Sequence, residues 1–157
     1  MTLGITIEAT DGRARAGRIA SHRGSFPTPV FMPVGTRGAV KLLDTRDLEA
    51  LAPPIVLGNT YHLMLRPGSE LVAGQGGLHR FMGWDGHLLT DSGGYQIFSL
   101  KPRITEEGAR FRSVYDGSLL DLTPERSVQI QQELGSDIAM VLDVCPALPA
   151  PDAVVRA

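Results

Sequence analysis

Polar residues that follow short apolar stretches are the first candidates for chemistry in this sequence. Asn59 ends the run "IVLGN", Asp91 follows "HLLT", and Asp143 follows "AMVL". Asp91 precedes a Ser-Gly-Gly turn, where glycines let a substrate approach the backbone, so its carboxylate could act as a general acid or base. An Asx-type turn that caps the next segment is an equally good interpretation of this short motif.

Asp143 and Tyr95 could recognise a planar heterocycle. A carboxylate only accepts hydrogen bonds, and guanine-like rings offer adjacent ring N–H and NH2 donors that it can bind in bidentate fashion. An arginine of the protein itself is the competing partner for Asp143, because an unpaired carboxylate beside apolar residues is costly. Tyr95 could stack on such a ring, although taken alone it is typical of a core residue.

The remaining reactive side chains favour structural roles. Cys145 is the only cysteine, and the four histidines are scattered without metal-ligand spacing. We therefore expect Cys145 to be a buried small apolar residue and no metal site in this chain. His62, in "NTYHLMLRPG", is interpreted as structural, and Ser92 lacks the Gly-x-Ser-x-Gly elbow of a hydrolase triad. Trp84 fits either a partner surface or a core residue beneath a loop.

Strands and helices alternate along the chain after an extended opening segment. Residues 3–34 predict a small antiparallel sheet, because β-branched and aromatic residues are interrupted by turn residues and prolines. Apolar strand-like runs follow at 55–59, 87–90 and 137–145. Helices are expected from Asp44 or Thr45 to Ala52, after Pro67, from a Thr123 cap to Gly135 and from Pro151, and a hairpin over 109–122 turns at Asp116-Gly117.

This alternation predicts an α/β fold with parallel strands. A doubly wound sheet and part of an eightfold barrel both satisfy it. The polar residues at the carboxyl ends of strands are typical of barrel enzymes, and no Gly-x-Gly-x-x-Gly follows the first parallel strand. The pattern therefore favours a partial TIM (β/α)8 barrel with an N-terminal antiparallel β-sheet.

Composition excludes several classes of protein. The chain has 157 residues, 43% of them hydrophobic, and a formal net charge of −2, which is typical of a packed domain without a pervasively basic surface. A single cysteine cannot form an internal disulfide, and no secretory signal opens the chain, so a reducing cytoplasm is expected. No apolar run approaches the ~20 residues needed to span a bilayer, so no membrane association is expected.

Longer motifs are far more specific than single residues. In order, they read "FMPVGT", "GNTYHLMLRPG", "GGLHRFMGW", "LLTDSGGYQIFSL", "DGSLLDLTPERSVQIQQELGSDIAM" and "LDVC". Together they resemble the bacterial tRNA-guanine transglycosylase family, also called queuine tRNA-ribosyltransferase, over residues 13–157. The resemblance implies a zinc-bearing TIM barrel that acts in queuosine biosynthesis. Such enzymes exchange guanine at the wobble position of tRNAs with GUN anticodons for 7-aminomethyl-7-deazaguanine.

The same resemblance implies a role for each site residue. Asp91 is the proton acceptor, and Asn59 orients it. Asp143 reads the donor edge of the base. Ser92, Gly93, Gly94 and Tyr95 line the base pocket, with Tyr95 stacked on the ring.

The sequence also departs from the family pattern. Val144 stands where bacterial members carry glutamate, and "CPALPAP" replaces the commoner Thr-Pro-x-Pro, which affects the expected base selectivity. The family's second aspartate, which is the ribose nucleophile, and its Cys3His zinc site are expected downstream of residue 157. We therefore expect residues 1–157 to be the N-terminal part of one TIM-barrel domain, with 1–34 as the antiparallel sheet, 35–157 as the first barrel units, and the C-terminal half missing.

The expected partners are tRNAs for Asp, Asn, His and Tyr, a 7-deazaguanine base, and a second copy in a homodimer of the full-length protein. Zinc is expected in the full-length protein, with ligands outside this chain. The 157 residues alone are expected to be inactive. The alternatives are a non-catalytic remnant or partner subunit of the same family, and an unrelated barrel hydrolase that uses Asp91 and Asp143 as an acid/base pair.

Overall fold

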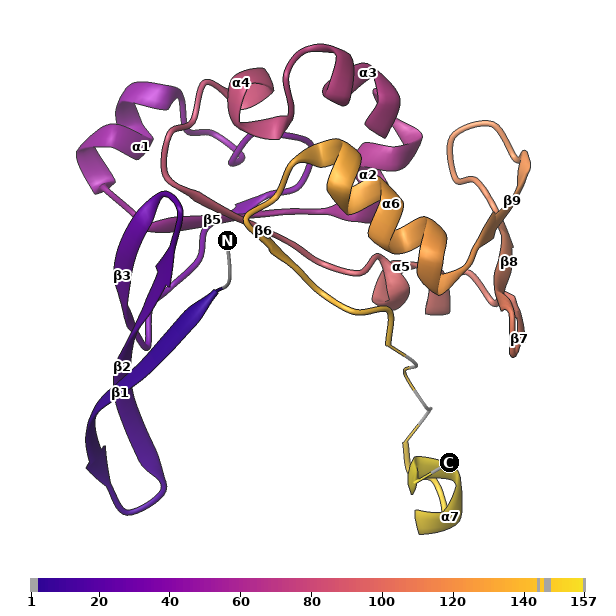
Figure 1. Cartoon of the computed structure of the whole chain (residues 1–157). Coiled ribbons are helices and arrows are strands. Elements are labelled where there is room, and N and C mark those ends of the chain that lie inside the picture. The colour runs from indigo at the N-terminus through magenta and orange to yellow at the C-terminus, as the bar shows by residue number, and fades with distance from the viewer. Residues whose placement is uncertain (1–2, 144, 146–147, 157) are drawn as a thin grey trace.

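The computed structural model describes residues 3–143, 145 and 148–156 (Figure 1). It is a mixed α/β structure with a parallel sheet, helices packed on that sheet, and two antiparallel sheets (Figure 1). The predicted α/β class is confirmed. None of the described helices is long and apolar enough to cross a lipid bilayer.

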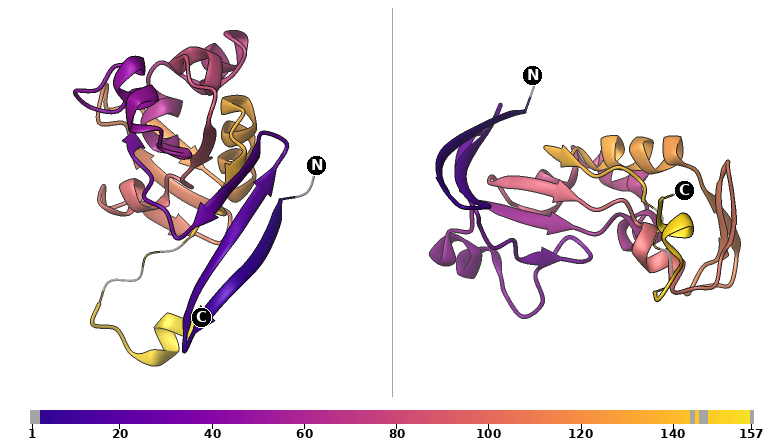
Figure 2. Two further views of the ribbon diagram at one scale, coloured as in Figure 1. Left: turned by 90° about the vertical axis from the view of Figure 1, so that its left-hand side faces the viewer. Right: turned by 90° about the horizontal axis from the view of Figure 1, so that it is seen from below.

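The N-terminal antiparallel sheet forms an arm beside the rest of the chain (Figures 1 and 2). Its strands are β1 (Gly4–Asp11), β2 (Ala14–Ser21) and β3 (Gly24–Thr28), in that order. The predicted opening sheet is thus confirmed, except at its end. Val34 and Gly35 form β4, which pairs in parallel with β5 (Ile55–Gly58) and so belongs to the second sheet. Pattern alone could not reveal this, because a two-residue strand carries no periodicity.

The parallel sheet contains β4, β5, β6 (His87–Thr90) and β10 (Ile138–Ala139) in the order β10-β6-β5-β4. All three pairings are parallel, and the four strands of this sheet lie side by side in the order in which they occur along the chain. The described strands form an open sheet and do not close into a barrel. Their carboxyl ends lie at one edge, where Asn59 and Asp91 follow β5 and β6.

The strand predicted over 137–145 is much shorter than expected. The Met140 N–H still donates to the Thr90 carbonyl of β6 at 3.1 Å, and β6 ends at that residue. The side chain of buried Gln131 also binds the Met140 backbone: its Oε1 accepts from the Met140 N–H at 2.9 Å, and its Nε2 donates to the Met140 carbonyl at 2.9 Å. A side chain thus satisfies backbone groups at the point where the chain leaves the sheet.

Helices cover one side of the parallel sheet (Figure 1). Three of them were expected from local signals: α1 (Thr45–Leu51) with an Asp44–Asp47 capping box, α3 (Ser69–Gly74) after Pro67, and α6 (Pro124–Leu134) between a Thr123 cap and Gly135 in the left-handed region. The C-terminal α7 (Asp152–Arg156) was also expected. The short helices α2 (Thr60–Leu65), α4 (Leu78–Met82) and α5 (Gly94–Phe98) were not. The apolar core lies between sheet and helices and includes Val56, Leu63, Val72, Leu78, Leu88, Ile130 and Leu134.

A second antiparallel sheet precedes α6. The predicted hairpin is formed by β8 (Gly108–Arg112) and β9 (Leu119–Leu122), with Asp116-Gly117 in the connecting loop. A third strand, β7 (Arg103–Thr105), pairs with β8 and was not predicted, because all three of its residues are exposed and show no alternation.

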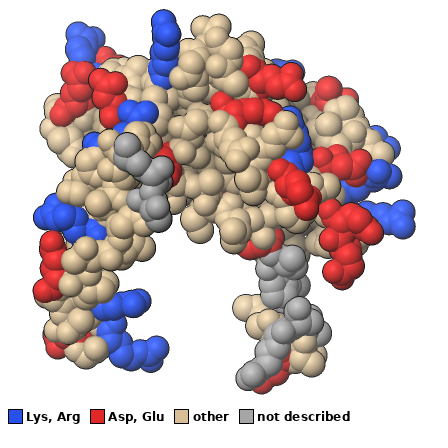
Figure 3. Space-filling model, in the orientation of Figure 1, with Lys and Arg blue, Asp and Glu red and all other residues tan. Residues whose placement is uncertain are grey.

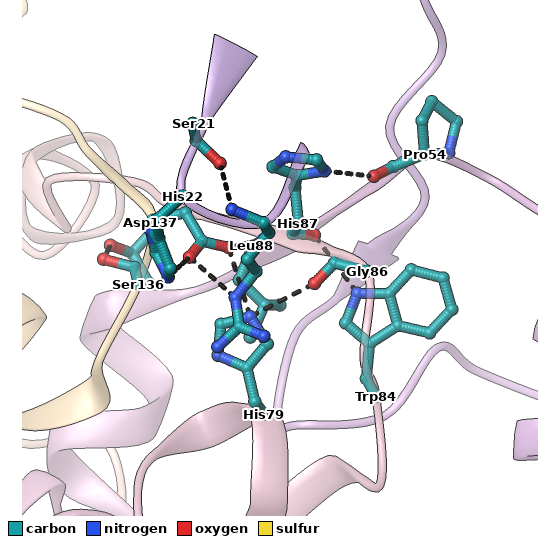
Figure 4. Close-up of polar contacts among 12 residues, drawn as sticks. Ser21, His22, Pro54, His79, Trp84, Gly86, His87, Leu88, Ser136 and Asp137 are labelled. Carbon is teal, nitrogen blue, oxygen red and sulfur yellow. Dashed lines mark hydrogen bonds and ion pairs between the residues drawn. The ribbon is translucent and has the colours of Figure 1, made fainter. Parts of the chain in front are cut away.

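A buried carboxylate ties the N-terminal arm to the parallel sheet (Figure 4). The Asp137 side chain is 1% exposed and accepts from Arg23 Nε at 2.8 Å and from the Leu88 N–H at 2.8 Å. Two histidines flank it, with Nε2 of His79 3.1 Å and Nε2 of His22 3.4 Å from its oxygens. His22 and Arg23 form the β2–β3 turn, so one carboxylate joins that turn to β6. Sequence analysis gave no role to this residue.

His79 in this cluster makes folding stability depend on pH. Burial lowers the pKa of His79 below its ordinary value, and the Arg23 charge acts in the same direction, although Asp137 opposes both. A lowered pKa in the folded state means that the unfolded chain binds the proton more readily. The contribution of His79 to stability is therefore complete above its ordinary pKa and decreases as pH falls below that value.

We expect a lower urea midpoint at pH 5.5 than at pH 7.5. The variant His79→Gln should show a shallower pH dependence, and an equally steep one would contradict this assignment.

Candidate functional site

Asn59 and Asp91 meet at the carboxyl edge of the parallel sheet. The Asn59 Nδ2 donates to Asp91 Oδ2 at 2.5 Å, while its Oδ1 accepts from the His62 N–H at 3.0 Å. Asn59 is the N-cap of α2 and is buried. Because its oxygen is held by the helix, its NH2 group must face Asp91. One amide therefore caps the helix and orients the carboxylate.

Asp91 is also held by the first residue of α2. Its Oδ1 accepts from the Thr60 N–H at 2.8 Å, and its backbone carbonyl accepts from Thr60 Oγ1 at 2.5 Å. The capping role considered for Asp91 thus exists, but it serves the N-terminus of α2 and not the segment that follows Asp91. These contacts fix one orientation of the carboxylate.

The electrostatic environment moves Asp91 toward neutrality. Burial raises the pKa of Asp91 above its ordinary value, and the nearby charge of Asp143 adds to the increase. The backbone N–H groups of Thr60 and Gly93 and the charge of His62 oppose it without cancelling it. A carboxyl group with a raised pKa exchanges protons more readily near neutral pH, which suits a general acid or base.

Ser92 and Asp143 form the second pair of the site. The Ser92 Oγ donates to Asp143 Oδ1 at 2.7 Å, and its carbonyl accepts from Ser127 of α6. Ser92 is buried and Asp143 is exposed. Asp143 Oδ2 has only the Cys145 thiol at 3.5 Å among the described residues, and no described arginine forms an ion pair with Asp143. The competing arginine partner is absent from this part of the chain, and one oxygen of Asp143 is left to accept from a ligand.

The glycine pair is packed against the chain itself. Gly93 has φ +81°, and a Cβ there would lie 3.4 Å from the Tyr61 nitrogen. A Cβ on Gly94 would lie 2.9 Å from the Asp143 carbonyl oxygen and 3.0 Å from Oδ1. The space expected for a substrate at these two positions is therefore filled by α2 and by the segment that carries Asp143. The glycines let α2 and the Asp143 segment pack closely against the turn that follows Asp91.

Tyr95 lies apart from these contacts. It is 71% exposed, so the interpretation as a core residue is wrong, and its ring is open to stacking. Its neighbour Gln96 has Oε1 buried without a partner among the described residues. Sequence reasoning missed Gln96, and no local signal marks it, because an unsatisfied amide oxygen is visible only in three dimensions.

A cavity of about 450 Å³ opens beside Asp143. Asp143 and Cys145 line it together with the polar Thr105 and Glu106 and with mostly apolar residues of α5, β7–β9 and the flanking segments. A second cavity of about 480 Å³ lies among β7–β9 and contains the Arg110–Asp121 ion pair but none of the predicted site residues. The first cavity is therefore the better candidate for a ligand.

Two other sequence interpretations are resolved. Trp84 is 8% exposed and donates its indole N–H to the His87 carbonyl at 3.1 Å, so it is a core residue and not a partner surface. Cys145 is half-buried, contrary to the expected full burial, and desolvation raises the pKa of its thiol. Val144 and part of "CPALPAP" lie outside the described residues.

No group of three described histidine, cysteine, aspartate or glutamate side chains could hold a metal ion. The described residues therefore do not fit a zinc site. The Asp137 cluster contains two histidines, but the Arg23 guanidinium takes the carboxylate oxygen that a metal would use. The chemistry of the described site is that of two carboxylates.

Comparisons with known proteins find relatives that match most of this chain. A family model described as queuine tRNA-ribosyltransferase matches residues 10–157. The queuine tRNA-ribosyltransferase of Cereibacter sphaeroides is 57% identical over 151 residues, which cover 95% of this chain and 40% of that protein. That of Solidesulfovibrio magneticus is 60% identical over 143 residues, which cover 90% of this chain and 38% of the relative. That of Idiomarina loihiensis is 51% identical over 158 residues, which cover 99% of this chain and 42% of the relative. The chain spans about two fifths of the length of these relatives.

Proposed function

The chain belongs to the queuine tRNA-ribosyltransferase family, and we propose that the protein containing it exchanges guanine at the wobble position of GUN-anticodon tRNAs for a 7-deazaguanine. The observation that carries this proposal is the pair of carboxylates at the edge of the parallel sheet. Asp91 has a raised pKa and a fixed orientation, while Asp143 keeps an oxygen open beside a cavity. One group suits proton transfer and the other suits recognition of a donor edge.

The proposed mechanism divides the work between these residues. Asp143 and Ser92 would hold the ring N–H and NH2 donors of the base, and Tyr95 would stack on its face. Asp91, oriented by Asn59, would accept the proton of the incoming base as its nitrogen attacks the ribose. Exchange with retention needs a nucleophile that holds the ribose between two displacements. We propose that an aspartate outside this chain supplies it.

The sheet order supports the proposed barrel. Four parallel strands follow one another in chain order, β4-β5-β6-β10, as they do in a (β/α)8 barrel and not across the switch point of a doubly wound sheet. We propose that residues 35–157 form the first units of such a barrel.

The proposal also covers the partners of the whole protein. Its acceptors would be tRNAs for Asp, Asn, His and Tyr, and its incoming base would be 7-aminomethyl-7-deazaguanine. It would bind zinc outside this chain, form a homodimer and have a cytoplasmic location.

Incorporation of labelled guanine into tRNA tests the proposed function. The full-length protein should incorporate label into a GUN-anticodon tRNA and should lose it again when 7-aminomethyl-7-deazaguanine is added. A tRNA with another wobble base is the control substrate. No incorporation would contradict the proposal and would favour a non-catalytic member of the family.

Asp143→Asn should weaken binding of the base. The substitution replaces an acceptor by an amide whose NH2 group faces the donors of the ligand. Loss of a hydrogen bond to a charged group costs about 1–3 kcal/mol, or roughly 5- to 150-fold in Kd. Calorimetric titration of the full-length protein with 7-aminomethyl-7-deazaguanine measures it. The exposed Asp152→Asn on α7 is the control, and equal affinities of the two variants would refute the role of Asp143.

A further inference from the structure

Two arginines share one aromatic ring near the candidate site. The guanidinium carbon of Arg66 lies 4.6 Å from the centroid of the Tyr115 ring, and that of Arg37 lies 5.4 Å from it. Arg66 follows α2, Arg37 follows β4, and Tyr115 belongs to the β8–β9 loop. Three segments distant in sequence therefore converge on this cluster, which we call the Arg37–Tyr115–Arg66 cluster.

The cluster carries positive charge without a counter-charge in the described chain. Both arginines are exposed, and neither forms an ion pair within 4.0 Å of a described carboxylate. Two cations over one ring repel each other, and the ring compensates only in part. On the face seen in Figure 3, basic and acidic side chains both lie around the periphery. An anion bound between the two guanidinium groups would remove the repulsion.

A chain of contacts joins this cluster to Asp91. The Tyr115 hydroxyl lies 3.5 Å from His62 Nδ1, and the His62 backbone N–H donates to Asn59, which in turn donates to Asp91. Burial lowers the pKa of His62 below its ordinary value, the charge of Arg37 lowers it further, and the charge of Asp91 opposes both. His62 thus lies between the cationic cluster and the candidate proton acceptor.

We propose that Arg37 and Arg66, held by Tyr115, bind a backbone phosphate of the RNA strand whose base is exchanged at Asp91. This inference rests on the proposed function, because a base can reach Asp91 only if its own strand passes nearby. A phosphodiester is an anion with oxygens that match the fork of guanidinium donors. The free base carries no such charge, so the cluster would act on the RNA and not on the incoming 7-deazaguanine.

Salt dependence of RNA binding tests the inference. The full-length protein and its Arg37→Gln/Arg66→Gln variant are titrated with a GUN anticodon stem-loop at several salt concentrations. Each lost phosphate contact should make the slope of log K against log salt shallower by about 0.7–0.9, and the double variant should bind roughly 10-fold more weakly at low salt. The double variant Arg13→Gln/Arg15→Gln, at exposed positions of the N-terminal arm, removes two charges elsewhere and is the control for net charge.

Two further measurements separate the alternatives. The variant Arg37→Lys/Arg66→Lys keeps the charge and should restore the salt slope. Calorimetry with 7-aminomethyl-7-deazaguanine should give the same Kd for the Gln double variant and the unmodified protein, which also shows that the variant is folded. An unchanged salt slope in the Gln variant would overturn this inference even if guanine exchange is observed. A shallower slope in a protein that fails to exchange guanine would support the RNA contact and refute the proposed function.

Discussion

Asp91→Asn is expected to reduce the rate of guanine exchange by about 10²–10⁴-fold, because a positioned general base typically contributes that much. The asparagine can still accept from the Thr60 N–H through its oxygen. Its NH2 group would then face the NH2 group of Asn59, and neither can accept the proton of the incoming base. The rate is measured as label incorporated into tRNA by the full-length protein under single-turnover conditions.

The same substitution should affect stability little. Because the folded pKa of Asp91 is raised, its stabilising contribution is complete only below the ordinary pKa of a carboxyl and is lost as pH rises through the folded value. At neutral pH the buried charge is therefore a cost, and Asn removes that cost while one hydrogen bond is lost. Asp85→Asn, in an exposed loop, is the control. A collapsed melting temperature with normal exchange in Asp91→Asn would make Asp91 a structural residue.

Asp137→Ala is expected to destabilise the fold by about 3 kcal/mol, since removal of one partner from a buried ionic contact leaves the others unsatisfied. The carboxylate is almost fully buried and receives Arg23 and the Leu88 N–H directly. Arg23 keeps partial access to water, which limits the loss. Urea denaturation of the full-length protein measures the change in the free energy of unfolding.

The location of the damage distinguishes this explanation from a general loss of packing. Hydrogen exchange should increase first in β3 and in the β2–β3 turn, because those residues lose their attachment to β6. A second contact between the sheets, the 4.7 Å approach of the Phe26 and His87 rings, remains. Asp11→Ala at the exposed end of β1 is the matched control. Equal unfolding free energies of the Asp137 and Asp11 variants would show that the contact adds no net stability.

Local signals in the sequence were sufficient for much of the fold. The cap at Thr123, the proline after it and Gly135 bounded α6 correctly, because each acts within one turn of the helix. The short helix α2 was missed, since its N-cap Asn59 was interpreted only as the polar end of a strand. The early end of β10 was missed, because β6 stops at Thr90 and no periodicity reveals the contacts of Gln131 with Met140.

The sequence suggested the residues of the candidate site and the contact of Asn59 with Asp91, whereas the other contacts of the site could not be predicted. Asn59, Asp91 and Asp143 were recognised by their positions at the ends of apolar runs and by family resemblance. That the Thr60 N–H binds Asp91 depends on two loops that meet in space. The cluster around Tyr115 was invisible for the same reason, because its three side chains come from segments far apart in the chain.

The double contact of Asn59 limits how this protein can evolve or be engineered. Aspartate at this position would keep the acceptor for the His62 N–H but would place a second negative charge against Asp91. Serine or threonine could cap the helix but could not reach both partners. A saturation library selected for thermostability and one selected for turnover would therefore retain the same residue at position 59. Neighbouring positions could instead be improved for one property at the expense of the other.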